Sequence, residues 1–133
     1  MTIEKEDLSV YNPEGSELRT LQLKMFDILI TVTDICDKHN IPYWLSGGTL
    51  LGAVRHGGFI PWDDDIDIGM TRENYNRFVT VAPGELGVSY FLSWTETDPH
   101  SPYYFPKVKK NNTLFVEELF KTVPMHPGNF VDI

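Results

Sequence analysis

The sequence contains a single cysteine, Cys36, and few basic residues. One cysteine excludes an internal disulfide. The 11 Lys and Arg stand against 19 Asp and Glu, so the formal net charge is −8. Proteins that bind nucleic acid usually present a basic surface to its phosphates, so we expect no nucleic-acid partner. No apolar run reaches the roughly 18 residues of a membrane helix, and the start MTIEKEDLSV lacks the regions of a secretory signal, which predicts a cytoplasmic protein without an integral membrane segment.

The length and composition favour one folded domain over residues 1–133. Of these residues, 41% are hydrophobic and 13% aromatic, which is enough for a hydrophobic core. Residues 1–15 are mostly polar and end in a turn, so we expect a flexible or loosely packed N-terminal segment. The last predicted strand, 130–133, runs to the terminus. We therefore expect the domain to be truncated at this end, or an oligomeric partner to supply a neighbouring surface.

Hydrophobic spacing predicts three helices and several short strands. Apolar residues recur every three or four positions from Leu18 to Ile35, which indicates a helix of about six turns that begins after a cap at Ser16. Shorter helices are expected at 49–54 and from the cap Thr71 to Pro83 and Gly84. Strands are expected at 41–45, 66–70, 90–94, 104–109, 114–118 and 130–133. This order predicts an α/β (α+β) fold with a mixed sheet flanked by helices.

Four aspartates lie within five positions: Asp63, Asp64, Asp65 and Asp67. In an extended chain Asp65 and Asp67 share one face, while Ile66 points to the core. Two such carboxylates repel each other unless a proton, a basic group or a divalent cation lies between them. Because the ligands are oxygens, Mg²⁺ or Mn²⁺ is the expected ion.

A solvated acidic loop, a helix cap and a calcium loop are the alternative interpretations of this cluster. A solvated acidic loop or a helix cap is common for aspartate clusters, but the apolar residues before and within this one favour a backbone held against a core. A calcium loop needs Gly at its sixth and Glu at its twelfth position. Ile68 and Asn74 occupy those positions, so a calcium loop is excluded.

A glycine turn, Ser46, Gly47 and Gly48, lies between a predicted strand and a predicted helix. Amide groups at a helix N-terminus attract phosphate, although a glycine pair alone is more often a simple tight turn. The turn is not a P-loop, because Ala53 stands where lysine is required, and it lacks the dinucleotide fingerprint. Together with a carboxylate pair, it indicates a site for phosphate and a divalent cation.

Residues 46–70, SGGTLLGAVRHGGFIPWDDDIDIGM, closely resemble the signature of the LicD family. These are phosphocholine transferases related to fukutin-type proteins within the nucleotidyltransferase superfamily. The resemblance continues more loosely in RENYNRF, KVKKNNT and the final NFVDI. It implies a nucleotidyltransferase-like fold, of which this chain resembles the N-terminal or core part.

The resemblance also implies roles for particular residues. By position, Ser46, Gly47 and Gly48 would bind the nucleotide phosphates. The implied metal ligands and catalytic acids are Asp65, Asp67 and Asp132, the last of which comes from the final strand and is the third acid of the family pattern.

Five neighbouring residues are further candidates. Arg55 could clamp a diphosphate, with a salt bridge to Asp63 or Asp64 as the alternative. Lys107 could neutralise phosphate charge, whereas Lys109 is expected to be solvated. We expect Trp62 to pack in the core rather than stack on a base, and His56 to close a helix.

The resemblance implies a metal-dependent transferase that moves a phosphocholine-like group from a CDP-activated donor to a sugar hydroxyl of a cell-surface glycan, lipopolysaccharide or teichoic acid. Asp132 would complete the metal site or accept the hydroxyl proton. Two alternatives remain open: a nucleotidyltransferase that releases pyrophosphate from an NTP, and a non-catalytic module that binds metal and nucleotide.

Overall fold

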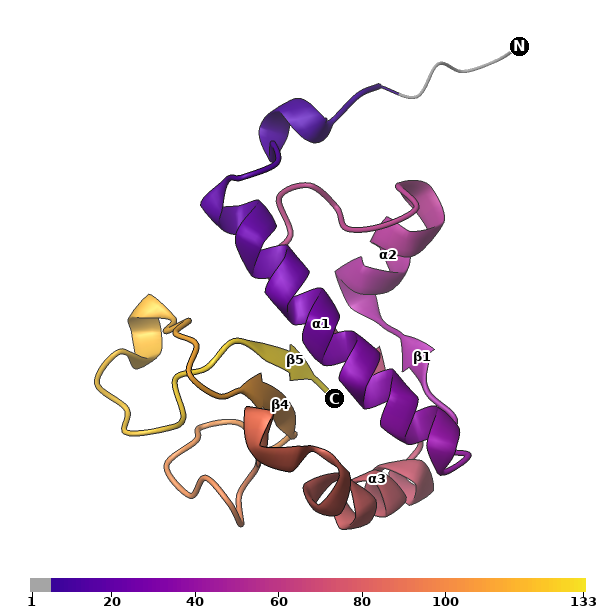
Figure 1. The fold of residues 1–133 in the computed structure, drawn as a ribbon, viewed down its shortest axis with the longest axis vertical. Coiled ribbons are helices and arrows are strands. Elements are labelled where there is room, and N and C mark those ends of the chain that lie inside the picture. The colour runs from indigo at the N-terminus through magenta and orange to yellow at the C-terminus, as the bar shows by residue number, and fades with distance from the viewer. Residues whose placement is uncertain (1–5) are drawn as a thin grey trace.

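The computed structural model describes residues 6–133 and is a mixed α/β domain (Figure 1). The helices are α1 (Glu17–Lys38), α2 (Gly47–Arg55) and α3 (Arg72–Glu85), and the strands are β1 (Trp44–Leu45), β2 (Ile68–Gly69), β3 (Tyr90–Ser93), β4 (Lys107–Lys110) and β5 (Phe130–Asp132). Single 3₁₀ turns lie at Ser9–Tyr11, Gly87–Ser89 and Glu118–Phe120. The prediction for residues 1–15 falls partly on residues 1–5, which lie outside the described residues.

Helix α1 runs the length of the molecule, with α2 beside its first half and α3 near its end (Figure 1). Its predicted cap is confirmed, because Ser16 Oγ accepts a hydrogen bond from the Arg19 amide (3.1 Å). Its core-facing side chains recur at helical spacing: Met25, Ile28, Val32, Ile35 and Cys36. The apolar period read in the sequence therefore defines the face that packs against the strands.

The strands form two small antiparallel sheets, β1-β2 and β3-β4-β5. A parallel bridge between Asp67 and Asp132 joins the end of β5 to the residue before β2. Across this bridge the spatial order is β1-β2-β5-β4-β3, with both parallel and antiparallel neighbours. The predicted mixed architecture is confirmed.

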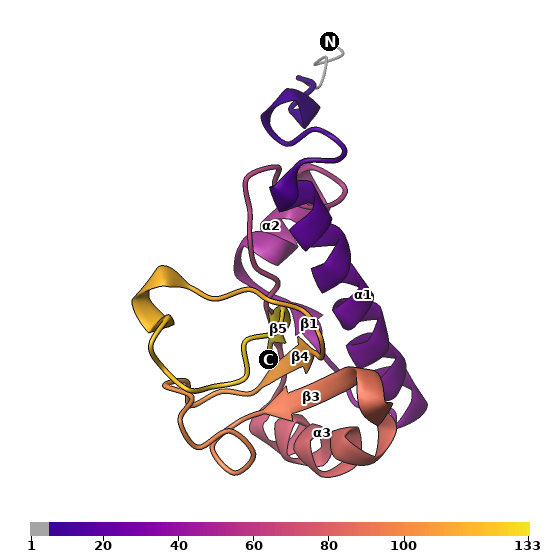
Figure 2. The same ribbon diagram turned by 60° about the vertical axis from the view of Figure 1, so that its left-hand side comes forward.

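Strand register sorts the side chains onto two faces. Residues paired directly across strands project to the same side, so Asp132, Lys107 and Ser93 form one row. The alternate row, Val131, Val108 and Leu92, is buried in the core. In Figure 2, α1 lies on one side of these strands and the segment 111–129 on the other. The polar row therefore faces away from the helical core.

Several element boundaries differ from the predictions. The first two strands are shorter than expected, and β4 begins only after Pro106, which has no N–H to donate to a ladder. Helix α3 continues through Pro83 to Glu85. Residues 114–118 are not a strand, because they cross the open face of the sheet, and Phe115 N bonds to Pro127 O (2.8 Å) within the same connection.

Among the described residues, no helix combines the length and the apolar character needed to cross a membrane.

Candidate active site

The site is built where the two sheets meet. Asp132 N donates to Ile66 O (2.9 Å), and Ser46 N donates to Asp67 O (3.1 Å). The Asp67 amide donates in turn to Thr49 Oγ1 (2.9 Å). These bonds fix the backbone of Asp67 between β5 on one side and the start of α2 on the other.

The first turn of α2 lies against the aspartates. Gly47 has a φ of +51°, which favours glycine. A Cβ on Gly47 would lie 3.4 Å from Asp67 Oδ2, and one on Gly48 would lie 2.7 Å from Asp63 Oδ2. The first helical bond runs from Leu50 N to Ser46 O (3.1 Å), so the preceding amides have no partner within the helix. The glycines thus let a helix N-terminus, which favours anions, approach the carboxylates closely.

The aspartate cluster is crowded with negative charge. Carboxylate oxygens of Asp63, Asp64 and Asp65 all lie within 4.8 Å of one another. Burial raises the pKa of Asp63 to about 6, and the neighbouring Asp65 carboxylate adds to this shift. Burial also raises the pKa of Asp67, again with a contribution from Asp65. Asp67 lies outside the tight group of three, toward Asp132.

Asp132 forms a salt bridge with Lys107. Lys107 Nζ lies 2.6 Å from Asp132 Oδ1, and the lysine side chain is only 3% exposed. Burial raises the pKa of Asp132 to about 6 although Lys107 opposes the shift, and Asp67 and Asp65 raise it further. The structure therefore brings Asp65, Asp67, Asp132 and Lys107 into one electrostatic group.

The donor set suits a divalent cation. Within residues 6–133, no Lys, Arg or His nitrogen lies within 4.0 Å of a carboxylate oxygen of Asp63, Asp65 or Asp67. The pKa values of Asp63 and Asp67 are raised by burial, and partly buried carboxylates without a basic partner are stabilised by a positive ion between them. Because all the donors are oxygens, Mg²⁺ or Mn²⁺ fits the residues present.

Arg55 lies at the other end of α2 from the glycine turn. Its Nε donates to His56 Nε2 (3.0 Å), its side chain is exposed, and the alternative salt bridge to Asp63 or Asp64 does not form. His56 is the C-cap residue of α2, as expected. Trp62 is 59% exposed and packs edge-to-face on Tyr11 (6.1 Å between centroids), so its predicted core position is wrong.

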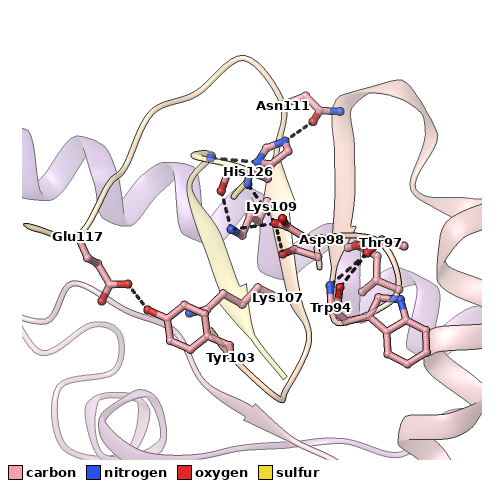
Figure 3. Close-up of polar contacts among 12 residues, drawn as sticks. Trp94, Thr97, Asp98, Tyr103, Lys107, Lys109, Asn111, Glu117 and His126 are labelled. Atoms are coloured by element: carbon pink, nitrogen blue, oxygen red, sulfur yellow. Dashed lines mark hydrogen bonds and ion pairs between the residues drawn. The ribbon is translucent and has the colours of Figure 1, made fainter. Parts of the chain in front are cut away.

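Lys109 is buried, contrary to its expected solvation. It is 2% exposed, its Nζ donates to His126 O (2.6 Å), and it lies 3.9 Å from Asp98 Oδ2 (Figure 3). Asp98 also accepts hydrogen bonds from Ser93 Oγ (2.9 Å) and His126 N (3.0 Å). Sequence reasoning missed Asp98 and His126 because both lie in irregular segments. The available signal was Lys109 itself, since a lysine two positions from Lys107 on a strand shares its face.

A glycine-initiated helix that faces carboxylates from two adjacent strands defines a nucleotidyltransferase-type α/β domain. The family described as LicD/FKTN/FKRP, nucleotidyltransferase domain, matches residues 40–130, and the chain belongs to this family.

Three relatives illustrate the range of the family. The lipopolysaccharide cholinephosphotransferase LicD of Haemophilus influenzae is 55% identical over 64 residues, which are 48% of this chain and 24% of that protein. The ribitol 5-phosphate transferase FKRP of Mus musculus is 41% identical over 103 residues, 75% of this chain and 20% of that protein. The mouse ribitol-5-phosphate transferase FKTN is 33% identical over 82 residues, 62% of this chain and 16% of that protein. The chain thus spans a quarter or less of each relative.

Proposed function

We propose that this domain transfers a phospho-alcohol group, phosphocholine-like, from a CDP-activated donor to a sugar hydroxyl of a cell-surface glycan, lipopolysaccharide or teichoic acid, and that it requires Mg²⁺ or Mn²⁺. One observation carries the proposal: Asp67 and Asp132 are paired across adjacent strands in front of the N-terminus of α2. The names of the relatives support the group transferred, because they include a cholinephosphotransferase and ribitol phosphate transferases.

Each residue of the site would have a distinct role. Asp65 and Asp67 would hold the cation, which when bound would neutralise charge on the diphosphate, and Asp132 would either complete the metal site or act as a base. The amides of Gly47 and Gly48 would hold phosphate oxygens. Lys107, which now neutralises Asp132, is close enough to that carboxylate to contribute positive charge to the same phosphate.

The reaction needs no covalent enzyme intermediate. The acceptor hydroxyl oxygen would form a bond to the phosphorus that carries the alcohol, and the bond from that phosphorus to the bridging oxygen would break, so that CMP leaves. Asp132, whose pKa is raised to about 6 mainly by burial, is the candidate to accept the hydroxyl proton. Most of the rate enhancement would come from positioning and charge neutralisation.

Product analysis separates this function from its alternatives. The chain is incubated with CDP-choline, CTP or ATP in the presence and absence of Mg²⁺. Metal-stimulated release of CMP from CDP-choline supports the transferase, pyrophosphate release from an NTP supports a nucleotidyltransferase, and nucleotide binding without turnover supports a non-catalytic module. Asp67→Asn should abolish CMP release and the stabilisation by Mg²⁺. Asp34→Asn is the matched control, because Asp34 is exposed on α1 and lies outside the aspartate cluster, and it should retain both.

A further inference from the structure

An open groove of about 530 Å³ lies between the first turns of α1 and the segment that follows β4. Asn129 and Asp64 also line it. Asp64 belongs to the tight group of three aspartates, so the groove borders the candidate metal site. Asp64 and Asn129 each precede a member of the bridged pair, Asp67 and Asp132, by three positions, which is about 10 Å along an extended chain. A ligand in the groove would therefore lie beside the proposed reaction centre.

Asn129 presents an unpartnered carboxamide to this groove. The residue is 2% exposed. Its backbone N–H donates to Thr113 Oγ1 (2.9 Å) and its carbonyl accepts from Lys110 N (2.8 Å), whereas its side chain makes no hydrogen bond within residues 6–133. Strand alternation places this side chain on the same face as Val131, toward α1 (Figure 2). Among the described residues, no side-chain N or O atom is both fully buried and unpartnered, so the Asn129 amide opens onto the groove.

Three charged side chains around the groove are also unpaired. Glu17, Lys24 and Asp64 are exposed, and in the described part of the chain none of them lies within 4.0 Å of an opposite charge. The groove thus offers two carboxylate acceptors, one ammonium donor and an amide that both donates and accepts. Hydroxyl groups, which also donate and accept, suit this set, whereas the two carboxylates would repel a phosphate.

The rest of the groove wall is apolar and consists of Leu18, Leu21, Leu114 and Phe115. The ring of Phe115 is held in place by Phe130, with 5.7 Å between the centroids. A sugar ring carries C–H groups on its faces and hydroxyls around its rim, so it can pack on apolar side chains while its hydroxyls bond to polar ones. The volume lies within the range of about 300–1,000 Å³ that is typical of small-molecule sites, and it is sufficient for a sugar ring.

Resting on the proposed function, we propose that this groove binds a neutral sugar unit of the acceptor glycan, with Asn129 and Lys24 as its main hydrogen-bonding residues. The bound unit would be a neighbour of the sugar whose hydroxyl reacts, because the groove lies about 10 Å from Asp67 and Asp132 along the strands. The groove thereby contributes to the choice of acceptor, while the aspartates and the glycine turn hold the donor.

Binding of simple glycosides to the whole chain, without donor or metal, tests the assignment. The probes are the methyl glycosides of glucose, galactose and N-acetylglucosamine. Cyclohexylmethanol, which has a similar ring but one hydroxyl, is the apolar control. In NMR titrations, at least one glycoside should bind with a Kd of about 10 mM or tighter and shift the side-chain amide signals of Asn129. Cyclohexylmethanol should bind about tenfold more weakly. Absence of binding by all three glycosides, or equal binding of cyclohexylmethanol, would overturn the proposal.

Variants locate the binding in the groove. Asn129→Leu keeps the side-chain size but removes both polar atoms, and it should weaken glycoside binding about tenfold. Lys24→Met removes the ammonium from an exposed helix position and should weaken binding about threefold or more. Lys38→Met is the matched control, because Lys38 is exposed on the same helix and pairs with Glu85 outside the groove, and it should bind as the wild type does.

Thermal melting confirms that each variant is folded. If Asn129→Leu does not fold, the comparison of Lys24→Met with Lys38→Met still tests the site. Equal glycoside affinity in these two lysine variants would refute the assignment.

The Asp67→Asn variant distinguishes failure of this inference from failure of the proposed function. Glycoside binding needs neither donor nor Mg²⁺, so Asp67→Asn should bind the glycosides as the wild type does. If binding depends on Lys24 and Asn129 while no CMP release is observed, the sugar groove stands without the transferase. If CMP release depends on Asp67 but no glycoside binds, the transferase function stands and the sugar groove is wrong.

Discussion

Asp67 and Asp132, from distant parts of the chain, are parallel bridge partners at the junction of the two sheets. Adjacent strands lie about 4.8 Å apart, so these two carboxylates share one small region. Burial raises the pKa of both. The pairing thus concentrates negative charge at the point where the first turn of α2 and Lys107 also converge.

Replacing Lys107 with Met should destabilise the protein. The change leaves the Asp132 carboxylate without its close partner in a buried position, and breaking such a pair costs about 3–5 kcal/mol. The loss should shrink at about pH 5, where Asp132 is protonated and needs no cation. Urea unfolding at two pH values measures the effect, and the double variant Lys107→Met/Asp132→Asn should recover part of the stability. A pH-independent loss would contradict this explanation.

The stabilisation by Mg²⁺ should increase with pH. Burial raises the pKa of Asp132 from 3.8 to about 6 in the folded chain, and it also raises the pKa of Asp67. The folded state therefore holds these protons more tightly than the unfolded state, so without metal this contribution to stability falls as pH rises from about 4 to about 6. Mg²⁺ binds the ionised carboxylates and should raise the melting temperature more at about pH 7.5 than at about pH 5.

Comparing melting curves with and without Mg²⁺ at each pH separates the effect of Mg²⁺ binding from the titration of carboxylates elsewhere in the protein. Asp27 and Glu85 have lowered pKa values, because Lys110 and Lys38, respectively, donate hydrogen bonds to them. The contribution of these two groups to stability therefore rises with pH instead of falling. Both lie outside the site, so their contribution cancels in the difference. A Mg²⁺ effect that is equal at both pH values would show that these carboxylates do not bind the ion.

Two glycines of α2 should respond differently to alanine. In Gly52→Ala the new Cβ would lie 2.5 Å from Gly58 O and 2.9 Å from Ile60 N. Backbone atoms cannot rotate away, so we expect a loss of about 1–3 kcal/mol. In Gly48→Ala the nearest atom is the end of the Asp63 side chain, at 2.7 Å, which can move. This variant should fold normally but bind Mg²⁺ more weakly. Thermal melting with and without Mg²⁺ distinguishes the two, and equal behaviour would contradict the geometry.

Replacing Asp98 with Asn should destabilise the protein, because buried Lys109 loses its negatively charged partner. The Lys109 and Asp98 side chains are 2% and 8% exposed, and a lone buried ammonium costs about 3–5 kcal/mol. Burial lowers the pKa of Lys109, so the variant should regain stability as pH rises and the lysine loses its proton. Urea unfolding from about pH 7 to about pH 9.5 measures this recovery. A loss that does not change with pH would show that Asp98 acts through its hydrogen bonds to Ser93 and His126 instead.

Local patterns predicted the parts of the fold that depend on local interactions. The three-and-four spacing from Leu18 to Ile35 predicts α1 because one helix face must be apolar wherever the helix packs. Successive side chains of an extended chain point to opposite faces, so the buried Ile66 and Ile68 place Asp65 and Asp67 on the other face. Segment 114–118 shows the limit, since its apolar residues cover the open side of the sheet without joining a ladder.

The sequence by itself determined the family, the order of the three helices and of every strand except the one expected at 114–118, and the acidic and glycine-rich segments, because each depends on residues close together in the chain. Only the tertiary structure decided which charges meet. Lys109 is buried against Asp98 and His126, Arg55 lies away from the glycine turn, and Glu117 enters an aromatic cavity beside Lys107. Such contacts depend on how the segment after β4 folds over the strands, and they join residues that no local periodicity relates.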